Sequence, residues 1–207
     1  MKNKLYIVGI SGGTGSGKTR AAKNLLLKFN PSEIALIEQD SYYKDLKNLP
    51  FEKREKVNFD HPDSIDFDLM YNDLKILIDT GIASIPMYDY KVHLRKSKKQ
   101  IIKQKQIIII EGIFSLYDSR IRDLMNLKIY VDTPDDIRVM RRIKRDINKR
   151  GRELNSIISQ YSSTVRTMHN RYIEPTKRYS DIILNQGGKN PIAINVIENT
   201  IKKYING

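Results

Sequence analysis

The stretch Gly12-Gly13-Thr14-Gly15-Ser16-Gly17-Lys18-Thr19 decides the fold of this chain. It matches in full the phosphate-binding pattern Gly-x-x-x-x-Gly-Lys-Ser/Thr, in which glycines let backbone amide groups wrap around phosphate oxygens. The pattern follows an apolar run, Leu5–Ile10, that predicts a strand, and it precedes a segment with helical spacing, Lys18–Phe29. The loop therefore stands before a helix whose positive end can face an anion.

This P-loop predicts which groups hold the phosphates of a nucleotide. We expect the backbone of residues 12–17 to cradle them, Lys18 to reach the β- and γ-phosphates, and the Thr19 hydroxyl to bind Mg²⁺. The pattern alone does not separate GTPases, helicases, transporters and kinases.

Short β-rich runs alternate with longer helical patterns along the chain, which is typical of an α/β protein with a mostly parallel sheet flanked by helices. Near-continuous apolar runs predict further buried strands at Ala35–Ile37, Ile107–Ile110, Lys128–Val131 and Asp181–Leu184. Helical spacing predicts helices at about Asp66–Asp79, Pro134–Lys149, Ser156–Tyr172 and Pro191–Tyr204. Residues 84–103 instead predict a small β-hairpin lobe beside the sheet. Because no linker divides the chain, we expect residues 1–207 to form one domain.

Composition and charge exclude several classes of protein. The absence of cysteine excludes disulfides and thiolate catalysis. The longest purely apolar run, Ile107–Ile110, is far shorter than the ~20 residues of a membrane span, and no secretion signal is evident. We therefore expect a cytoplasmic protein with no membrane partner. The formal net charge of +13 leaves a second interpretation open, a basic nucleic-acid-binding ATPase, although no aromatic residues interleave with basic ones to stack bases.

A second acidic group is expected beside the P-loop. The apolar run Ile107–Ile110 ends in Glu111-Gly112, and a carboxylate at the end of a buried strand can bind Mg²⁺ directly or through water. Glu111 is therefore a candidate metal ligand.

A cluster of arginines predicts a lid over the transferred phosphoryl group. Arg138, Arg142, Arg145 and Lys149 follow one another at spacings of four, three and four, which places them along one helical face. Arg141, Arg150 and Arg152 lie close by, and Gly151 is placed to end the helix and permit a hinge. Arginine suits this task because its planar fork binds phosphate oxygens in pairs and stays charged. We expect the lid at about residues 138–161.

The same region argues against a GTPase. The nearest match to the guanine-binding pattern Asn-Lys-x-Asp is Asn148-Lys149-Arg150-Gly151, which lacks the aspartate.

The ordered set of motifs along almost the whole chain resembles the uridine-cytidine kinase family. The segments that carry the resemblance are Gly9-Ile10-Ser11-Gly12-Gly13, Gln39-Asp40-Ser41-Tyr42-Tyr43, Asn58-Phe59-Asp60-His61-Pro62-Asp63, Pro86-Met87-Tyr88-Asp89-Tyr90 with His93 and Arg95, Arg145-Asp146-Ile147, Arg150-Gly151-Arg152, Ser159-Gln160-Tyr161 and Glu174-Pro175-Thr176-Lys177. The resemblance implies a P-loop NTPase-type fold and transfer of phosphate from ATP, or GTP, with Mg²⁺ to the ribose 5′-hydroxyl of uridine or cytidine. It also implies a homotetramer, feedback inhibition by pyrimidine triphosphates, and a nucleoside rather than a nucleic acid as partner.

The resemblance also assigns roles to residues. It implies that Asp40 is the general base and lies near the metal, and that Asp60 binds the ribose hydroxyls with help from Arg142, Arg152 and Gln160. Lys18, Arg145 and Arg150 act on the phosphoryl group.

The resemblance further implies that Tyr88 and His93 contact the edge of the pyrimidine. Their odd separation would make them face opposite ways on a flat strand, so a turn must bring them together. His61 and His169 are interpreted as structural residues.

Two departures from the family pattern are mild, because Ile110 replaces a frequent aromatic residue and Tyr90 a frequent phenylalanine. Alternatives in the same class are kinases that resemble phosphoribulokinase or pantothenate kinase, although neither acceptor carries a pyrimidine for Tyr88 and His93 to bind.

Overall fold

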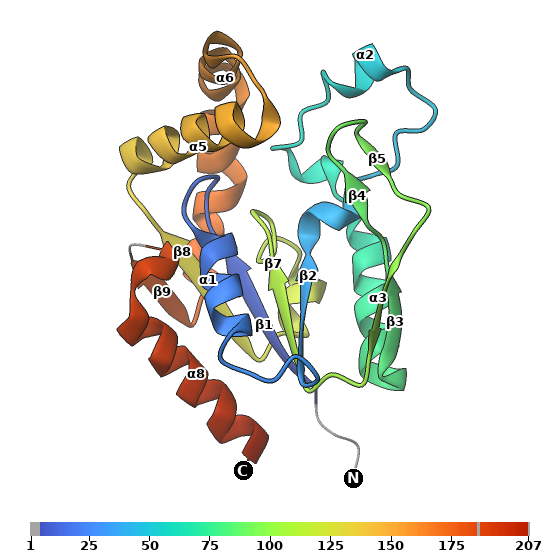
Figure 1. Cartoon of the computed structure of the whole chain (residues 1–207), viewed down its shortest axis with the longest axis vertical. Coiled ribbons are helices and arrows are strands. Elements are labelled where there is room, and N and C mark those ends of the chain that lie inside the picture. The colour runs from blue at the N-terminus through green and yellow to red at the C-terminus, as the bar shows by residue number, and fades with distance from the viewer. Residues whose placement is uncertain (1–4, 186, 207) are drawn as a thin grey trace.

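The computed structural model describes residues 5–185 and 187–206, and its centre is a five-stranded parallel sheet (Figure 1). The strands are β1 (Tyr6–Ser11), β2 (Ile34–Glu38), β7 (Ile107–Glu111), β8 (Leu127–Asp132) and β9 (Ile182–Asn185), in the spatial order β2-β7-β1-β8-β9. Every neighbouring pair in this sheet is parallel. The α/β prediction is confirmed, and each predicted strand is present close to its expected ends.

Both faces of the central strands β1 and β7 are buried, which explains why their sequences are almost continuously apolar. Ile7 and Ile108 belong to the core cluster that packs against α3 and α4, whereas Val8 and Ile109 belong to the cluster under α1 and α8. Successive residues of a strand point to opposite faces, so β1, β2, β7 and β8 each supply both clusters, and β9 contributes Ile182 and Leu184 to the cluster under α1 and α8.

The predicted helices are present with small shifts of their ends. The α-helices are α1 (Lys18–Leu26), α2 (Phe51–Arg54), α3 (Phe67–Thr80), α4 (Ser119–Asp123), α5 (Asp135–Arg150), α6 (Leu154–Gln160), α7 (Arg166–Met168) and α8 (Pro191–Asn206). The 3₁₀-helices are η1 (Gln39–Tyr42), η2 (Pro62–Ser64), η5 (Glu174–Tyr179) and η6 (Gly187–Lys189), and π-helical turns occupy η3 (Tyr161–Val165) and η4 (His169–Ile173). The single helix expected over residues 156–172 is therefore a run of α- and π-helical turns from α6 to η4.

The hairpin lobe is present and begins slightly earlier than expected. Strand β3 (Ile82–Ile85) pairs antiparallel with β6 (Gln100–Lys103), and β4 (Tyr88–Asp89) pairs antiparallel with β5 (Leu94–Arg95) at the far end. Ala83, Ile85 and Ile102 are buried in the cluster that contains α3, so the base of the lobe shares the core of the sheet. In Figure 1 the lobe and α2 stand on one side of the carboxyl edge of the sheet, and α5 and α6 stand on the other.

Arg95 ties the outer end of the lobe to the rest of the fold. Its Nε donates a hydrogen bond to the Tyr43 carbonyl at 2.8 Å, and its Nη2 contacts the Asp66 Oδ2 at 3.1 Å. Asp66 also caps α3 by accepting a hydrogen bond from the Leu69 amide. A single guanidinium thus joins β5, the segment after β2 and the start of α3.

Within the described part of the chain, no helix is long and apolar enough to span a bilayer.

Replacing Arg95 should loosen the lobe. Arg95→Met keeps an apolar stem but removes the hydrogen bonds to the Tyr43 carbonyl and to Asp66. We expect the free energy of unfolding to fall by about 1–3 kcal/mol, the usual cost of losing hydrogen bonds that involve a charged group. Denaturant unfolding measures this. The matched control is Lys96→Met, because Lys96 makes one exposed 3.9 Å contact with Asp89 and should change stability little. Equal stability of the two variants would contradict the prediction.

Candidate active site

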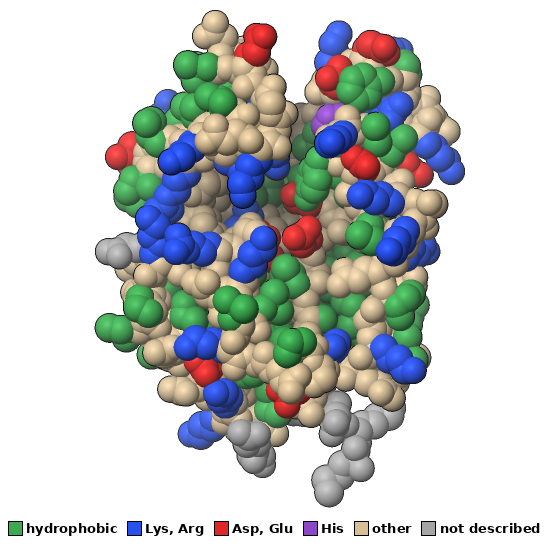
Figure 2. All heavy atoms as spheres, viewed as in Figure 1, with side chains coloured by type: hydrophobic (Ala, Val, Ile, Leu, Met, Phe, Trp, Pro, Cys, Tyr) green, Lys and Arg blue, Asp and Glu red, His purple; other side chains and the backbone are tan. Residues whose placement is uncertain are grey.

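The candidate functional groups gather where the parallel strands end. The P-loop follows β1, Asp40 lies in η1 directly after β2, and Glu111 is the last residue of β7. Carboxyl ends of parallel strands meet at one edge of a sheet, where ligands bind in open α/β folds. Figure 2 shows a hollow at this edge, with basic side chains gathered on the α5 side and acidic side chains inside it.

Glycine is required in the P-loop for two reasons. Gly12, Gly15 and Gly17 have positive φ angles of 146°, 76° and 99°, a region that side chains disfavour. A Cβ atom at Gly15 would also collide with the Arg138 carbonyl, and one at Gly13 with the Arg138 guanidinium. The loop therefore lies directly against the start of α5.

Polar contacts from the β8–α5 segment fix the loop. The Thr133 hydroxyl donates to the Ser16 carbonyl at 2.9 Å, and Arg142 Nη1 donates to the Thr14 hydroxyl at 3.1 Å. The buried Ser16 hydroxyl has no hydrogen-bond partner among the described residues. This unpaired group leaves the loop with a donor available to a ligand oxygen.

Lys18, Thr19 and Glu111 form one cluster at the start of α1. Lys18 Nζ lies 3.5 Å from Glu111 Oε1, and the Thr19 hydroxyl donates to Glu111 Oε2 at 3.1 Å. Burial raises the pKa of the Glu111 carboxyl, an effect that the charge of Lys18 opposes and that of Asp40 reinforces. The carboxylate is thus held in place beside the P-loop before any ligand binds.

This cluster fits Mg²⁺, which prefers a few protein oxygens together with water and phosphate oxygens. A hydroxyl and a carboxylate lie side by side, and the charge of Asp40 acts on the same carboxylate. In the part of the chain that the structure describes, no group of three or more acidic, histidine or cysteine side chains could hold a metal alone. The donor set therefore suits a metal that arrives with nucleotide phosphates.

The side chains of Tyr88 and His93, both from the lobe, gather around the ring of Phe59, and the three form an aromatic cluster. The His93 ring stacks on Phe59 with centroids 5.1 Å apart, and the Tyr88 ring meets the same side chain at 6.3 Å. His93 adopts a left-handed φ of 52° in the turn between β4 and β5. The turn expected from the odd spacing of Tyr88 and His93 is therefore present, and it brings the two side chains to one place.

Two properties of these side chains suit recognition of a polar ring. The Tyr88 hydroxyl is buried and has no hydrogen-bond partner among residues 5–185 and 187–206. Burial lowers the pKa of His93, so its neutral imidazole can donate from one nitrogen and accept at the other near pH 7.

Asp60 follows Phe59 of this cluster in sequence and faces Arg142 on α5. Its amide is fixed by the Asn58 side chain at 3.1 Å, and its Oδ1 lies 3.8 Å from Arg142 Nη1. Burial raises the pKa of the Asp60 carboxyl, and the charge of Arg142 opposes that rise. Asp60 and Arg142, both expected to bind the ribose hydroxyls, therefore lie beside each other, whereas the binding itself stays a prediction.

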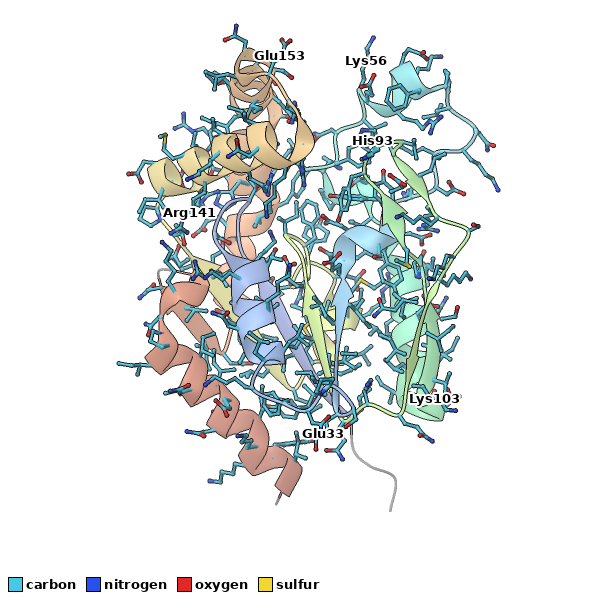
Figure 3. The ribbon with its side chains drawn as sticks, in the orientation of Figure 1. Glu33, Lys56, His93, Lys103, Arg141 and Glu153 are labelled. Atoms are coloured by element: carbon cyan, nitrogen blue, oxygen red, sulfur yellow. The ribbon has the colours of Figure 1, made fainter. Side chains whose placement is uncertain are left out.

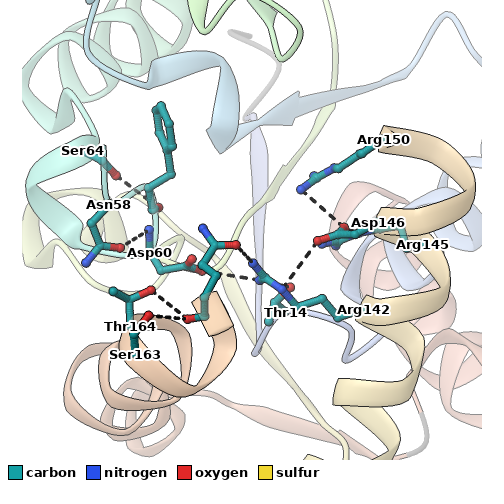
Figure 4. A network of polar contacts seen from close by, with 12 residues as sticks. Thr14, Asn58, Asp60, Ser64, Arg142, Arg145, Asp146, Arg150, Ser163 and Thr164 are labelled. Carbon is teal, nitrogen blue, oxygen red and sulfur yellow. Dashed lines mark hydrogen bonds and ion pairs between the residues drawn. The ribbon is translucent and has the colours of Figure 1, made fainter. Parts of the chain in front are cut away.

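The lid arginines converge on Asp146, a fully buried carboxylate on α5 (Figure 4). Arg145 Nε lies 2.8 Å from Asp146 Oδ1, and Arg142, Arg150 and Arg152 each lie 3.6 Å from one of its two oxygens. A single carboxylate thus holds together four cations that would otherwise repel one another.

Gln160 completes this arrangement from α6. Its Oε1 accepts hydrogen bonds from Arg142 Nη2 at 2.9 Å and from Arg152 Nη1 at 2.7 Å. Gly151 ends α5 with a φ of 64°, and the Arg152 amide then donates back to the Asp146 carbonyl at 3.1 Å. The turn predicted at Gly151 is confirmed, whereas a hinge motion there stays a prediction.

A basic cavity of about 510 Å³ opens beside Gly17. Its cationic lining is Arg20, Arg141, Lys144, Arg145, Lys149 and Lys189. In Figure 3, Arg141 on α5 and His93 on the lobe lie on opposite sides of the carboxyl edge of the sheet. The basic side chains of this cavity thus meet the P-loop at Gly17.

Two residues close to the loop serve as its support. Arg138, expected on the lid face, is buried and donates from Nε to the Thr133 carbonyl at 3.1 Å, so it lies beneath the P-loop rather than on an open face. His169, interpreted as structural, is buried close to Gly13, and burial lowers its pKa to about 4.

His61 pairs with the Tyr172 hydroxyl at 3.0 Å, as a structural histidine does.

Sequence reasoning gave no role to Asp146, Tyr90 or Phe59. Asp146 stands among several cations on one helix, a signal that could have marked it as their common partner. Tyr90 donates from its hydroxyl to Asp40 Oδ2 at 3.2 Å, a contact between positions 50 residues apart that spacing cannot predict.

The chain is similar in sequence to known kinases over almost its whole length. The model of the "Phosphoribulokinase / Uridine kinase family" matches residues 7–193. A uridine kinase of Clostridium botulinum is 50% identical over 96% of this chain and 97% of its own length. A uridine kinase of Streptococcus gordonii is 48% identical over 99% of this chain and 98% of its own.

A solved structure shares the fold. D-glycerate 3-kinase from Cryptococcus neoformans superposes with a TM-score of 0.64 over 88% of this chain and 87% of that one, at 13% identity. The P-loop with its neighbouring carboxylate, the cluster of arginines and the extent of the sequence match lead to one assignment: this chain is a kinase that belongs to the phosphoribulokinase and uridine kinase family.

Proposed function

We propose that this kinase transfers the γ-phosphoryl group of ATP to the ribose 5′-hydroxyl of uridine or cytidine. The observation that carries the proposal is the position of Asp40 between two sites. Burial raises the pKa of Glu111 beside the P-loop, and it also raises the pKa values of Asp60 and Tyr88 beside Phe59. The charge of Asp40 raises all three pKa values further. A carboxylate that acts on both sides lies where a phosphate donor and an alcohol would meet.

The donor side follows from the P-loop and the basic cavity. The triphosphate is bound by the amides of residues 12–17 and by Lys18, and the nucleoside of the donor lies in the cavity beside Gly17. When bound, Mg²⁺ would neutralise charge on the phosphates, and Thr19, Glu111 and Asp40 are the residues that would hold it. Parallel assays with ATP and with GTP decide which donor is preferred.

The proposed acceptor follows from the chemistry of the aromatic cluster and of Asp60 beside it. Asp60 can accept hydrogen bonds from two neighbouring ribose hydroxyls, and Arg142, 3.8 Å away, would help to bind them. Arg152 and Gln160, which are hydrogen-bonded to each other, are further candidate contacts for the ribose. The unpaired Tyr88 hydroxyl and the neutral His93 ring provide hydrogen bonds for a pyrimidine edge. The relatives named uridine kinase support the same choice of acceptor.

The chemical step needs little covalent work from the protein. The 5′-oxygen forms a bond to the γ-phosphorus while the bond from that phosphorus to the β,γ-bridging oxygen breaks, and the proton of the hydroxyl passes to Asp40. Because the transition state is loose, Asp40 mainly orients the hydroxyl, and Arg145 and Arg150 stabilise the charge on the transferred group. The closed lid keeps water from competing as acceptor.

Other expectations rest on the same proposal. The nucleoside acts as a small-molecule partner, and we propose a cytoplasmic homotetramer that does not bind nucleic acid. The acceptors of phosphoribulokinase-like and pantothenate kinase-like enzymes are less consistent with the aromatic cluster. Neither ribulose 5-phosphate nor pantothenate carries an aromatic ring for Phe59, Tyr88 and His93 to contact.

A panel of acceptors tests the proposed activity. We expect purified protein with ATP and Mg²⁺ to phosphorylate uridine or cytidine, and ribulose 5-phosphate and pantothenate to give no product. Product formation is followed by ADP release and chromatography. Absence of turnover on both pyrimidine nucleosides would refute the proposal, and RNA-stimulated ATP hydrolysis with salt-sensitive RNA binding would favour a nucleic-acid-binding ATPase instead.

Asp40→Asn tests the proposed base. The amide keeps the size of the side chain but cannot take the proton, so we expect kcat to fall by about 10²- to 10⁴-fold. The dissociation constant for uridine, measured by calorimetry, should stay within a few-fold of the wild-type value. If the variant turns over as fast as the wild type, Asp40 is not the base.

Asp146→Asn tests whether the buried carboxylate positions the lid arginines. Without its charge, these arginines lose their common partner, and misplaced phosphate-binding groups cost about 10²-fold in kcat/KM for ATP. Asp146→Glu keeps the charge and should recover part of the activity, whereas Asp123→Asn, at an exposed position of α4, is the neutral control. Thermal unfolding of each variant separates a loss of activity from a loss of fold. Unchanged kcat/KM in the asparagine variant would show that the arginines do not need Asp146.

A further inference from the structure

Tyr90 contacts three parts of the candidate site at once. It lies in the turn after β4, and its ring meets the Tyr88 ring edge-on at 5.5 Å. The Arg150 guanidinium carbon of the lid lies 5.7 Å from the centre of the same ring. Its hydroxyl donates to Asp40 Oδ2 at 3.2 Å, so one side chain joins the lobe, the lid and the edge of the sheet.

Toward Asp40 the hydroxyl acts as the donor. A carboxylate oxygen accepts hydrogen bonds, so the proton of this contact comes from the tyrosine. Among the residues that the structure describes, Tyr90 is the side chain whose hydrogen bond to the Asp40 carboxylate is observed. Its loss would leave the torsion of that carboxylate to be set by packing alone.

We propose that Tyr90 is a positioning residue for Asp40: by binding Oδ2, the hydroxyl turns Oδ1 toward the acceptor alcohol. The inference rests on the proposed function, because it needs Asp40 to act on an acceptor hydroxyl. It deepens that function by assigning separate tasks to the two oxygens of one carboxylate. Oδ2 is held by the lobe, and Oδ1 receives the proton of the alcohol.

The ring and the hydroxyl have separable effects. The ring carries the contacts with Tyr88 and Arg150, and the hydroxyl alone reaches Asp40. The phenylalanine that the family resemblance leads us to expect at this position would keep the ring contacts without the hydrogen bond. Tyr90→Phe therefore removes one hydrogen bond and keeps the contacts of the ring with Tyr88 and Arg150.

The test combines Tyr90→Phe with a double-mutant cycle. We expect kcat to fall about tenfold while KM for ATP and for the acceptor stay within about twofold, because a hydrogen bond to a charged group is lost without loss of a binding surface. In an Asp40→Ala background, Tyr90→Phe should change the residual rate by less than about twofold, because the hydroxyl then has no carboxylate to hold. Tyr71→Phe on α3 is the matched control, because it removes a hydroxyl from a tyrosine that packs against Arg120 outside the site.

Each result decides the inference. An unchanged kcat in Tyr90→Phe would overturn it, and so would the same fold-change in rate with and without the Asp40 carboxylate. The rates are measured with whichever acceptor the panel identifies, so a wrong choice of nucleoside leaves this test intact. If wild-type protein phosphorylates no acceptor, the proposed function and this inference are both wrong. Turnover by the wild type with an equally active Tyr90→Phe variant refutes the inference alone.

Discussion

The close packing of the P-loop against the start of α5 is the constraint on which the rest of the site depends. No side chain can separate them, because a Cβ at Gly13 or Gly15 would collide with Arg138. The glycines thus do more than permit positive φ angles, since they let the phosphate-binding amides and the arginine-bearing helix share one surface. The hydrogen bond from Thr133 to the Ser16 carbonyl holds this register. From there, α5 carries its remaining arginines to the edge of the loop.

The buried carboxylates around that surface are each paired with a cation. Glu111 is paired with Lys18, Asp60 with Arg142, and Asp146 with several arginines. Each carboxylate fixes a cation before a ligand arrives, so the arginines and the lysine do not have to be collected during the reaction. Preorganised cations stabilise developing charge at little reorganisation cost, which is the property that a phosphoryl-transfer site requires.

The sequence was sufficient for the features that a local pattern encodes, namely the P-loop, the parallel strands and the end of α5 at Gly151. The spacing of the arginines predicted that they share one face of α5. It did not predict that Arg138 is buried under the P-loop. Contacts between distant segments, such as the hydrogen bond from Tyr90 to Asp40, could not be predicted from spacing. The π-helical turns after α6 also have no simple signature, because their residues keep ordinary helical propensities. The functions of individual site residues stay predictions, since a fold supplies positions and not roles.

The high net charge of +13 is explained in part by where the cations lie. The cavity beside Gly17 gathers basic side chains from α1, α5 and η6, and the acidic groups Glu111 and Asp40 lie at the inner end of the site. A nucleic-acid groove would need a basic surface that continues past the P-loop, together with aromatic platforms for bases. The aromatic residues of this site instead pack on one another in one cluster at the lobe, beside η1. The basic cavity attracts the charge of a triphosphate, and the carboxylates Glu111 and Asp40 end the positive surface. A positive surface of this limited extent favours a small phosphorylated ligand over a polymer.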